Sequence, residues 1–261
     1  IFAAGTAQDR GESGGLKLAV LRVLDRLATG AADVIVVDTV EHGDRLAPSL
    51  AARRVVVPVG APSDWFDAAS VSGAGADVAP SVPLSVVFYG LFTPLQGTPT
   101  IARALRRLYD EGAPVRATLI GKGQDLGECR EILADADTVT WRDWVPAAEL
   151  PSVVAGHDVC LGIVGTTAKA QDVVPNKVYQ GIAAGCAVVT SNTAPQRRVL
   201  EDAAVLVPAG DDEALATALR RLAQDRSALE DARVAASRGS DRFHPEAVVG
   251  PLLDRLDEEM D

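Results

Sequence analysis

Hydrophobic and polar positions follow two patterns that alternate along most of the chain. Short β-branched runs such as LSVVFYG (84–90) and AVVTS (187–191) are typical of strands buried on both faces. Longer stretches such as TPTIARALRRLYDEG (98–112) place apolar residues on one side of a helix. This alternation predicts a doubly wound parallel sheet with helices on both faces. The predicted strands of this α/β sheet span 84–90, 115–121, 138–141, 158–164, 187–191 and 204–208.

A segment rich in Ala, Ser, Gly and Pro (61–83) interrupts this pattern. Such a composition is typical of a domain boundary. Before it, the chain shows a helical stripe from residue 16 and two strand-like runs, DVIVVDT and RRVVVPVG. We therefore predict two domains joined by a linker and followed by a terminal helical segment. Their predicted ranges are 1–68, 69–82, 83–242 and 243–261.

Charge and composition exclude several classes of function. The net charge of −11 and the pI of about 4.8 argue against a nucleic-acid-binding protein. No apolar run is long enough for a transmembrane helix, although peripheral membrane contact stays open. The start, IFAAGTAQDRGESGG, resembles no signal peptide and lacks Met, so we expect a fragment or a trimmed chain.

Cysteine and histidine are too dispersed to predict a metal site. Cys160 and Cys186 lie in apolar runs far from Cys129, which predicts buried free thiols in a reducing, cytoplasmic compartment. The histidines form neither an HExxH motif nor a cluster with cysteine. We therefore expect no bound metal.

Candidate chemistry lies in the loops that follow the strands, because ligands of doubly wound sheets bind outside the carboxyl ends of the strands. In GLFTPLQG (90–97), the glycines fit either a simple turn or a close approach of phosphate to a helix N-terminus. GKGQDLG (121–127) departs from GxGxxG, which argues against a nicotinamide or flavin site. Gly121 leaves room for a ligand, whereas Lys122 fits an ordinary turn at least as well.

Two further loops carry polar or aromatic residues at strand ends. In WRDWVPAAEL (141–150), we expect Trp141 to pack in the core, while the backbone of residues 144–146 could hold a flat base above Leu150. In DVVPNKVYQG (172–181), Pro175 suits the first position of a helix whose N–H groups could meet an anion. The alternative for this second loop is an ordinary solvated helix start.

These segments together resemble a known family. YGLFTPLQGTPTIARAL, ATLIGKG, VTWRDWVPAAELPSVVAGHDVCLGIV and PNKVYQGIAAGCAVVTSNT resemble, in order and spacing, the carboxyl-terminal domain of a GT-B glycosyltransferase. The similarity is to the retaining group that uses nucleotide-diphosphate sugars (glycosyltransferase family 4-like). Residues 16–66 resemble the end of the amino-terminal Rossmann-like domain of that group, which implies that most of this second domain is missing.

The resemblance implies a metal-independent transferase whose donor-binding half is this chain. It requires no cofactor other than the nucleotide-sugar substrate, and its acceptor would be a glycan, a lipid-linked intermediate or a small molecule. The helix after residue 243 would cross back to the missing amino-terminal domain. Without that domain, we expect the isolated chain to be inactive in transfer.

The family pattern of two Glu residues with seven residues between them falls on Asp172 and Gln180, which would face the sugar and the ribose. The loop after the first strand carries Gln96 where the family has Lys, and it has no Arg. Because a diphosphate leaving group requires positive charge, we hypothesise that Lys177 supplies part of it, helped by the helix dipole and the amides of residues 90–97. Lys122, Arg142 or Lys169 could add to it. The catalytic residues would be Asp172 and Lys177, and the donor-binding residues Gly90, Gln96, Gly97, Gly121, Lys122, Trp144, Val145, Leu150, Val174, Pro175, Asn176, Lys177 and Gln180.

Two alternatives stay open. The missing Arg and Lys favour a non-catalytic GT-B-like binding or activator protein with a degenerate donor site. A nucleotide-sugar epimerase would need catalytic acids in the missing domain.

Overall fold

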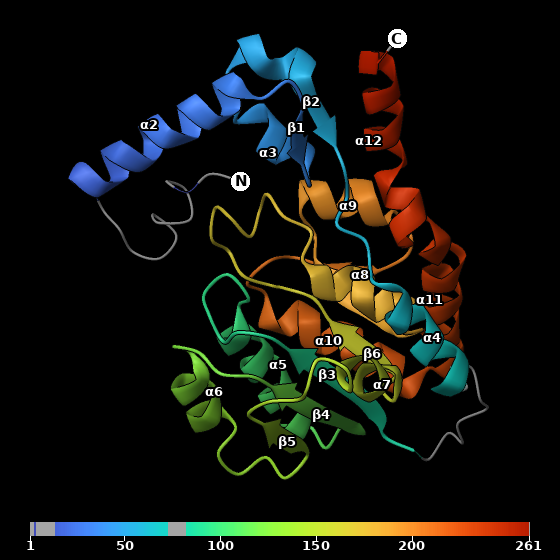
Figure 1. Cartoon of the computed structure of the whole chain (residues 1–261). Helices are drawn as coiled ribbons and strands as arrows, with labels where there is room; N and C mark the ends of the chain where they lie inside the picture. Colours follow the sequence, from blue (N-terminus) through green and yellow to red (C-terminus); the bar gives the residue numbers. More distant parts are fainter. Residues whose placement is uncertain (1–2, 4–13, 73–81, 261) are drawn as a thin grey trace. The chain divides into compact units, whose positions relative to one another are not determined.

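The structure, a computed structural model, describes residues 3, 14–72 and 82–260. It divides into two compact units (Figure 1). The larger unit comprises Val59–Ala247, and the smaller comprises Ile1–Pro58 with Val248–Asp261. Each unit has its own parallel sheet.

The larger unit contains the predicted sheet, in which every neighbouring pair of strands is parallel. The strand order is β5-β4-β3-β6-β7-β8, so β3 lies between the two halves of the sheet and the order reverses at β3 and β6. This confirms the doubly wound α/β class, and it places a topological switch point at the carboxyl end of β3. The strands are β3 (Leu84–Tyr89), β4 (Val115–Ile120), β5 (Val139–Arg142), β6 (Val159–Leu161), β7 (Ala187–Ser191) and β8 (Val205–Val207).

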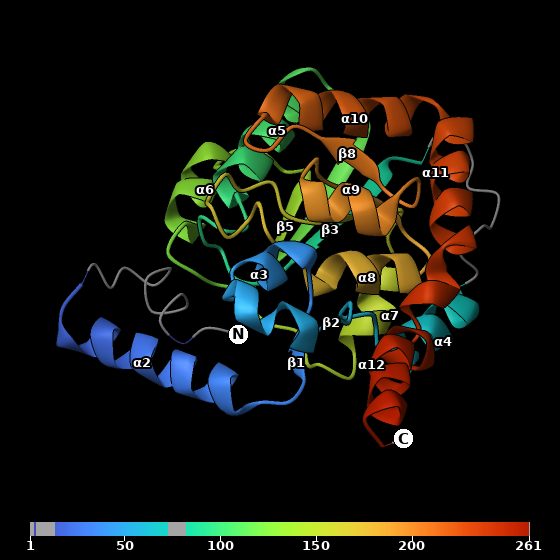
Figure 2. The same cartoon turned by 90° about the horizontal axis from the view of Figure 1, so that it is seen from above.

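Helices cover both faces of this sheet because successive strand side chains point to opposite sides. Phe88 of β3 joins the core beneath α5 and α10, which lie side by side (Figure 2). Val87 joins the core of the opposite face, with Tyr179 of α8 and Phe243 of the 3-10 helix η2. The helices are α4 (Ser63–Ser72), α5 (Thr98–Asp110), α6 (Leu126–Ile132), α7 (Leu150–Ala155), α8 (Asn176–Ala183), α9 (Ala194–Leu200), α10 (Asp212–Gln224) and α11 (Arg226–Arg238), with η2 at Ser240–Phe243.

The smaller unit is built on two parallel strands, β1 (Ile35–Val37) and β2 (Arg54–Val56). Ile35 and Val37 form its core with Leu46. The predicted helical stripe forms α2 but is largely exposed, with Leu16 83% exposed and Leu27 65% exposed. The remaining helices are α2 (Leu16–Ala31), α3 (Val40–Asp44), η1 (Pro48–Arg53) and α12 (Pro245–Met260), the last of which begins in the larger unit.

The unit boundary lies earlier than the sequence composition predicts. Residues 69–72 of the predicted linker belong to α4, and residues 73–81 lie outside the described residues. Helix α4 belongs to the larger unit because Trp65 is buried in its core and the Ala61 N–H donates a 2.9 Å hydrogen bond to the Phe243 carbonyl. The larger unit therefore begins at Val59 rather than near residue 83, and it ends at Ala247 rather than at residue 242.

Helix α8 packs unusually closely on the sheet. A Cβ added at Gly181 would lie 2.7 Å from Cβ of Cys160 on β6 and 3.1 Å from a methyl carbon of Val188 on β7. No side chain fits between the helix and these strands, so Gly181 sets the height of α8 above the sheet.

We predict that Gly181→Ala destabilises the larger unit. Overpacking costs about 1–3 kcal/mol, which exceeds the ~1 kcal/mol that Ala gains over Gly in a helix. Gly127→Ala in α6 is the matched control, because no atom lies within 4 Å of its added Cβ. Urea denaturation of both variants measures the difference. Equal stability of the two variants would contradict the close packing at Gly181.

Candidate functional site

A cavity of about 600 Å³ opens at the carboxyl ends of β3, β4 and β5. It brings together predicted residues that lie far apart in the sequence, namely Gly90, Gly121, Lys122, Trp144, Val145 and Leu150. Sequence analysis missed the other residues that line it, which are Tyr89, Leu91, Ile120, Asp143 and Ala147. The signal was available, because Tyr89 and Ile120 end their strands and the others lie in the candidate loops 90–97 and 141–150.

Two glycines form the floor of this cavity, where the strand ends meet. Gly90 and Gly121 have φ angles of +133° and +135°, which residues other than glycine rarely adopt. A Cβ on Gly121 would lie 1.8 Å from the Gly90 carbonyl oxygen. The Gly90 N–H donates to Ile120 and the Gly121 N–H to Arg142, so the ladder of the sheet continues through both residues. This close backbone approach is sufficient reason for Gly121, whereas at Gly90 the positive φ angle is the constraint.

The rim of the cavity combines an exposed indole with buried aliphatic groups. Trp144 is 76% exposed, whereas the neighbouring Val145 is buried. Trp141 packs against the core as predicted, with its ring centroid 6.2 Å from that of Phe92. Lys122 forms an exposed 3.2 Å ion pair with Asp143 at the opening. The cavity is therefore largely apolar, with charge only at its edge.

Beside this cavity, the Lys177 side chain leaves the start of α8 and is buried, with only 6% of its surface exposed. Its Nζ donates a 2.5 Å hydrogen bond to Oε1 of Gln96 and lies 3.8 Å from the centroid of the Phe88 ring. A Cβ on Gly90 would lie 3.1 Å from this Nζ. Residues of β3 and of the loop that follows it thus meet the amine of Lys177.

Burial without a counter-ion changes the titration of Lys177. In the part of the chain that the structure describes, no carboxylate pairs with it. Burial therefore lowers its pKa from 10.5 to about 7.

The start of α8 differs in detail from the prediction. Pro175 is the N-cap residue, with φ −74° and ψ 146°, and the helix begins at Asn176 rather than at Pro175. The extended ψ of Pro175 keeps it outside the helix. The Val178 N–H donates a 2.9 Å hydrogen bond to the Pro175 carbonyl, so the N–H groups of Asn176 and Lys177 are the ones that the first turn leaves without a partner in the helix.

The remaining predicted residues lie in α8, in the segment before it or in the 90–97 loop, and none of them lines the cavity. Gln180 Oε1 accepts a 2.8 Å hydrogen bond from the Tyr89 hydroxyl, and burial raises the pKa of this tyrosine well above its usual value. Gln180 therefore touches the cavity wall through a neutral phenol. Asp172 is half-buried in the loop before α8, Val174 is buried, and Gly97 has φ +70° and packs against the backbone of residue 165.

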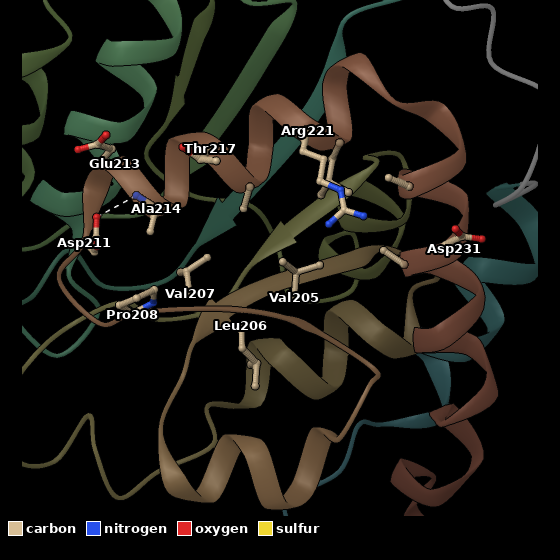
Figure 3. Close-up of a pocket in the computed structure, with 14 residues that line it drawn as sticks. Val205, Leu206, Val207, Pro208, Asp211, Glu213, Ala214, Thr217, Arg221 and Asp231 are labelled. Atoms are coloured by element: carbon tan, nitrogen blue, oxygen red, sulfur yellow. Dashed lines mark hydrogen bonds between the residues drawn. The ribbon is translucent and has the colours of Figure 1, made fainter.

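A second cavity, of about 650 Å³, lies between β8, α10 and α11 (Figure 3). Val205 and Val207 form its base, and the guanidinium of Arg221 reaches over it. The side chain of Asp211 accepts a hydrogen bond from the Ala214 N–H and caps α10. Because β8 is the edge strand farthest from β5, this cavity lies at the other edge of the sheet, and it shares no lining residue with the first cavity.

The three cysteines are buried and free, as predicted. Burial raises the pKa of Cys129 to about 11 and that of Cys160 to about 12, so neither is a reactive thiolate near neutral pH. Among the described residues, no group of three or more His, Cys, Asp or Glu side chains could hold a metal ion. In the same part of the chain, every helix is too short or too polar to cross a membrane.

The chain is similar to known proteins both in sequence and in fold. The family model described as "Glycosyl transferases group 1" matches residues 83–225. No curated protein sequence matches the chain.

Solved structures similar to the chain include three proteins of bacterial origin. The pneumococcal O-GlcNAc transferase GtfA, in complex with UDP and GlcNAc, is 17% identical with a TM-score of 0.69, over 91% of this chain and 47% of that protein. Anabaena HepE in complex with UDP is 15% identical with a TM-score of 0.70, over 95% of this chain and 69% of that protein. Sucrose-phosphate synthase from Thermosynechococcus elongatus is 17% identical with a TM-score of 0.72, over 99% of this chain and 66% of that protein. The chain thus spans about half to two thirds of these proteins, and the likeness shows the predicted GT-B fold.

We predict that Lys177→Met stabilises the protein at neutral pH. Below pH 7 the lysine is charged in both the folded and unfolded states, so its full burial cost, roughly 3–5 kcal/mol for a pKa of about 7, weakens the fold. As pH rises from 7 towards 10.5, the folded wild type loses this cost and becomes more stable. The gain from Lys177→Met, measured by urea denaturation, should therefore shrink between pH 6.5 and 9.5. A gain that is independent of pH would contradict this prediction.

Proposed function

Because the chain belongs to the glycosyl transferases group 1 family, we propose that it binds a nucleotide-diphosphate sugar and supplies the donor-binding half of a transferase. The observation that carries this proposal is the cavity at the carboxyl ends of β3, β4 and β5 with the buried amine of Lys177 beside it. UDP in the HepE and GtfA complexes supports a nucleotide as the ligand.

In this proposal, the cavity holds the base and the ribose. Val145 and Leu150 offer apolar contacts to a flat base, and the backbone of residues 144–146 offers hydrogen bonds to its edge. Gln180 lies next to the cavity through Tyr89, which suits a contact with a ribose hydroxyl.

The diphosphate would lie between the cavity and the start of α8. Lys177 Nζ lies 2.5 Å from Gln96 Oε1, so this chain delivers positive charge to the loop position where the resembled family has Lys. The first N–H groups of α8 and its dipole would add to this charge. Stabilising a leaving diphosphate in this way requires no metal ion, and Asp172 would face the transferred sugar.

The resemblance to the retaining group supports transfer with retention of configuration. The acceptor would be a glycan, a lipid-linked intermediate or a small molecule, bound mainly by an amino-terminal domain. The buried free cysteines support a reducing, cytoplasmic location.

A non-catalytic donor-binding or activator protein is the second candidate. The observation in its favour is that the 90–97 loop contains neither Arg nor Lys. The full enzyme with its acceptor distinguishes the two, since only the first candidate releases nucleotide diphosphate on turnover.

We predict that this chain binds at least one of UDP-, GDP-, ADP- or dTDP-glucose. A donor present at 100 times its dissociation constant should raise the free energy of unfolding by about 2.7 kcal/mol. Ala147 is exposed and lines the cavity, so Ala147→Trp should fill the base site and weaken binding by about 10-fold or more. Ala148→Trp is the matched control, because Ala148 is exposed next to it but outside the lining. A lack of binding to all four donors would refute the proposed function.

Lys177→Met should weaken donor affinity by about 10-fold or more, because it removes a charge-assisted contact to the diphosphate. Lys17→Met, in the exposed helix α2, is the control with the same change in side chain. Isothermal titration of both variants against the donor measures the difference. Equal affinity of the two variants would exclude Lys177 from the donor site.

A further inference from the structure

Lys177 is a buried amine, and no carboxylate of the described residues forms an ion pair with it. Its Nζ meets an amide oxygen of Gln96 and the face of the Phe88 ring. Both contacts favour an ammonium group, but neither neutralises it. Burying an unpaired charge costs free energy. The ammonium group of such a site therefore either pairs with an anion or loses its proton.

The titratable groups around Lys177 do not supply the missing charge. Tyr89 of β3 lies with its ring centroid 5.8 Å from Nζ, and Cys160 of β6 interacts with it electrostatically. Burial raises the pKa of Cys160 to about 12 and that of Tyr89 well above its usual value, so both are neutral near pH 7. The 90–97 loop presents Gln96, which is also neutral.

We propose that Lys177 takes up a proton from solvent when the donor diphosphate binds, and returns it when the nucleotide leaves. This inference rests on the proposed function, since the diphosphate is the anion that completes the site. The free amine and one proton become an ammonium group, so the donor complex gains one charge at Lys177. Donor affinity is thereby linked to pH.

The free state supports this coupling, because burial lowers the pKa of Lys177 to about 7. A bound diphosphate raises the pKa of the amine again by direct charge interaction. At pH 8 about nine tenths of the free sites would hold neutral amine, and at pH 6 about one tenth.

Gln96 acts as a positioning residue in this scheme. Its amide oxygen holds the amine against Phe88 without fixing its charge. In Gln96→Glu, a carboxylate at the same place would keep Lys177 charged in the free site. This variant should therefore bind donor without proton uptake, and more weakly because its carboxylate repels the diphosphate.

The test is calorimetric titration of the chain with UDP-, GDP-, ADP- and dTDP-glucose in buffers of different ionisation enthalpy. These sugar donors are diphosphate diesters, so they lack the phosphate group that titrates near pH 6. The wild type should take up roughly 0.5–0.9 proton at pH 8 and almost none at pH 6. Its affinity should fall by up to about 10-fold per pH unit above pH 7.

Variants separate the proton uptake from donor binding. Lys177→Arg keeps a permanent charge and should bind with no uptake at pH 8. Lys17→Met should retain the uptake of the wild type. Donor binding without uptake in the wild type, or uptake that persists in Lys177→Arg, overturns the coupling and leaves the proposed function intact. No binding of any of the four donors overturns both.

Discussion

The contact between α8 and the strands beneath it is the constraint on which the candidate site depends. Gly181 lets the helix approach β6 and β7 so closely that no side chain fits between them. The start of α8 is therefore fixed relative to the carboxyl ends of the strands. From this position the Lys177 side chain runs inward to the loop after β3, while Gln180 meets Tyr89 at the cavity wall. A looser helix would move both side chains away from the residues they contact.

The burial of Lys177 lowers the stability of the fold and places a group that can become positively charged beside the cavity. A lysine beneath Gly90, in contact with Phe88 and Gln96, weakens the fold when it is charged, because no carboxylate in the part of the chain that the structure describes pairs with it. A hydrophobic residue of similar length would pack there at lower cost. In the proposed function, the donor diphosphate would offset this cost by supplying the negative charge that the site lacks.

Much of the fold could be predicted because its signals are local. Short β-branched runs separated by amphipathic stretches determine the strands and helices. The strand-end rule placed Gly90, Gly121 and Val145 at one edge of the sheet, where they line one cavity. The unit boundary could not be predicted from composition, because Trp65 belongs to the larger core through contacts with residues far away in the sequence. The same holds for Lys177. Its position in the helix indicated an exposed residue at an anion site, whereas its burial and its contact with Gln96 depend on the fold of three segments.

The indole of Trp144 gives the candidate site an optical consequence. The chain has three tryptophans, of which Trp65 is buried, Trp141 is half-buried against Phe92, and Trp144 is 76% exposed at the cavity rim. The emission of Trp144 therefore reports on water at the mouth of the cavity, while that of Trp65 reports on the core. A molecule that settles on the rim would therefore change the emission of Trp144 directly, whereas Trp65, which stacks on Tyr89 with ring centroids 5.8 Å apart, would sense it only through the cavity wall.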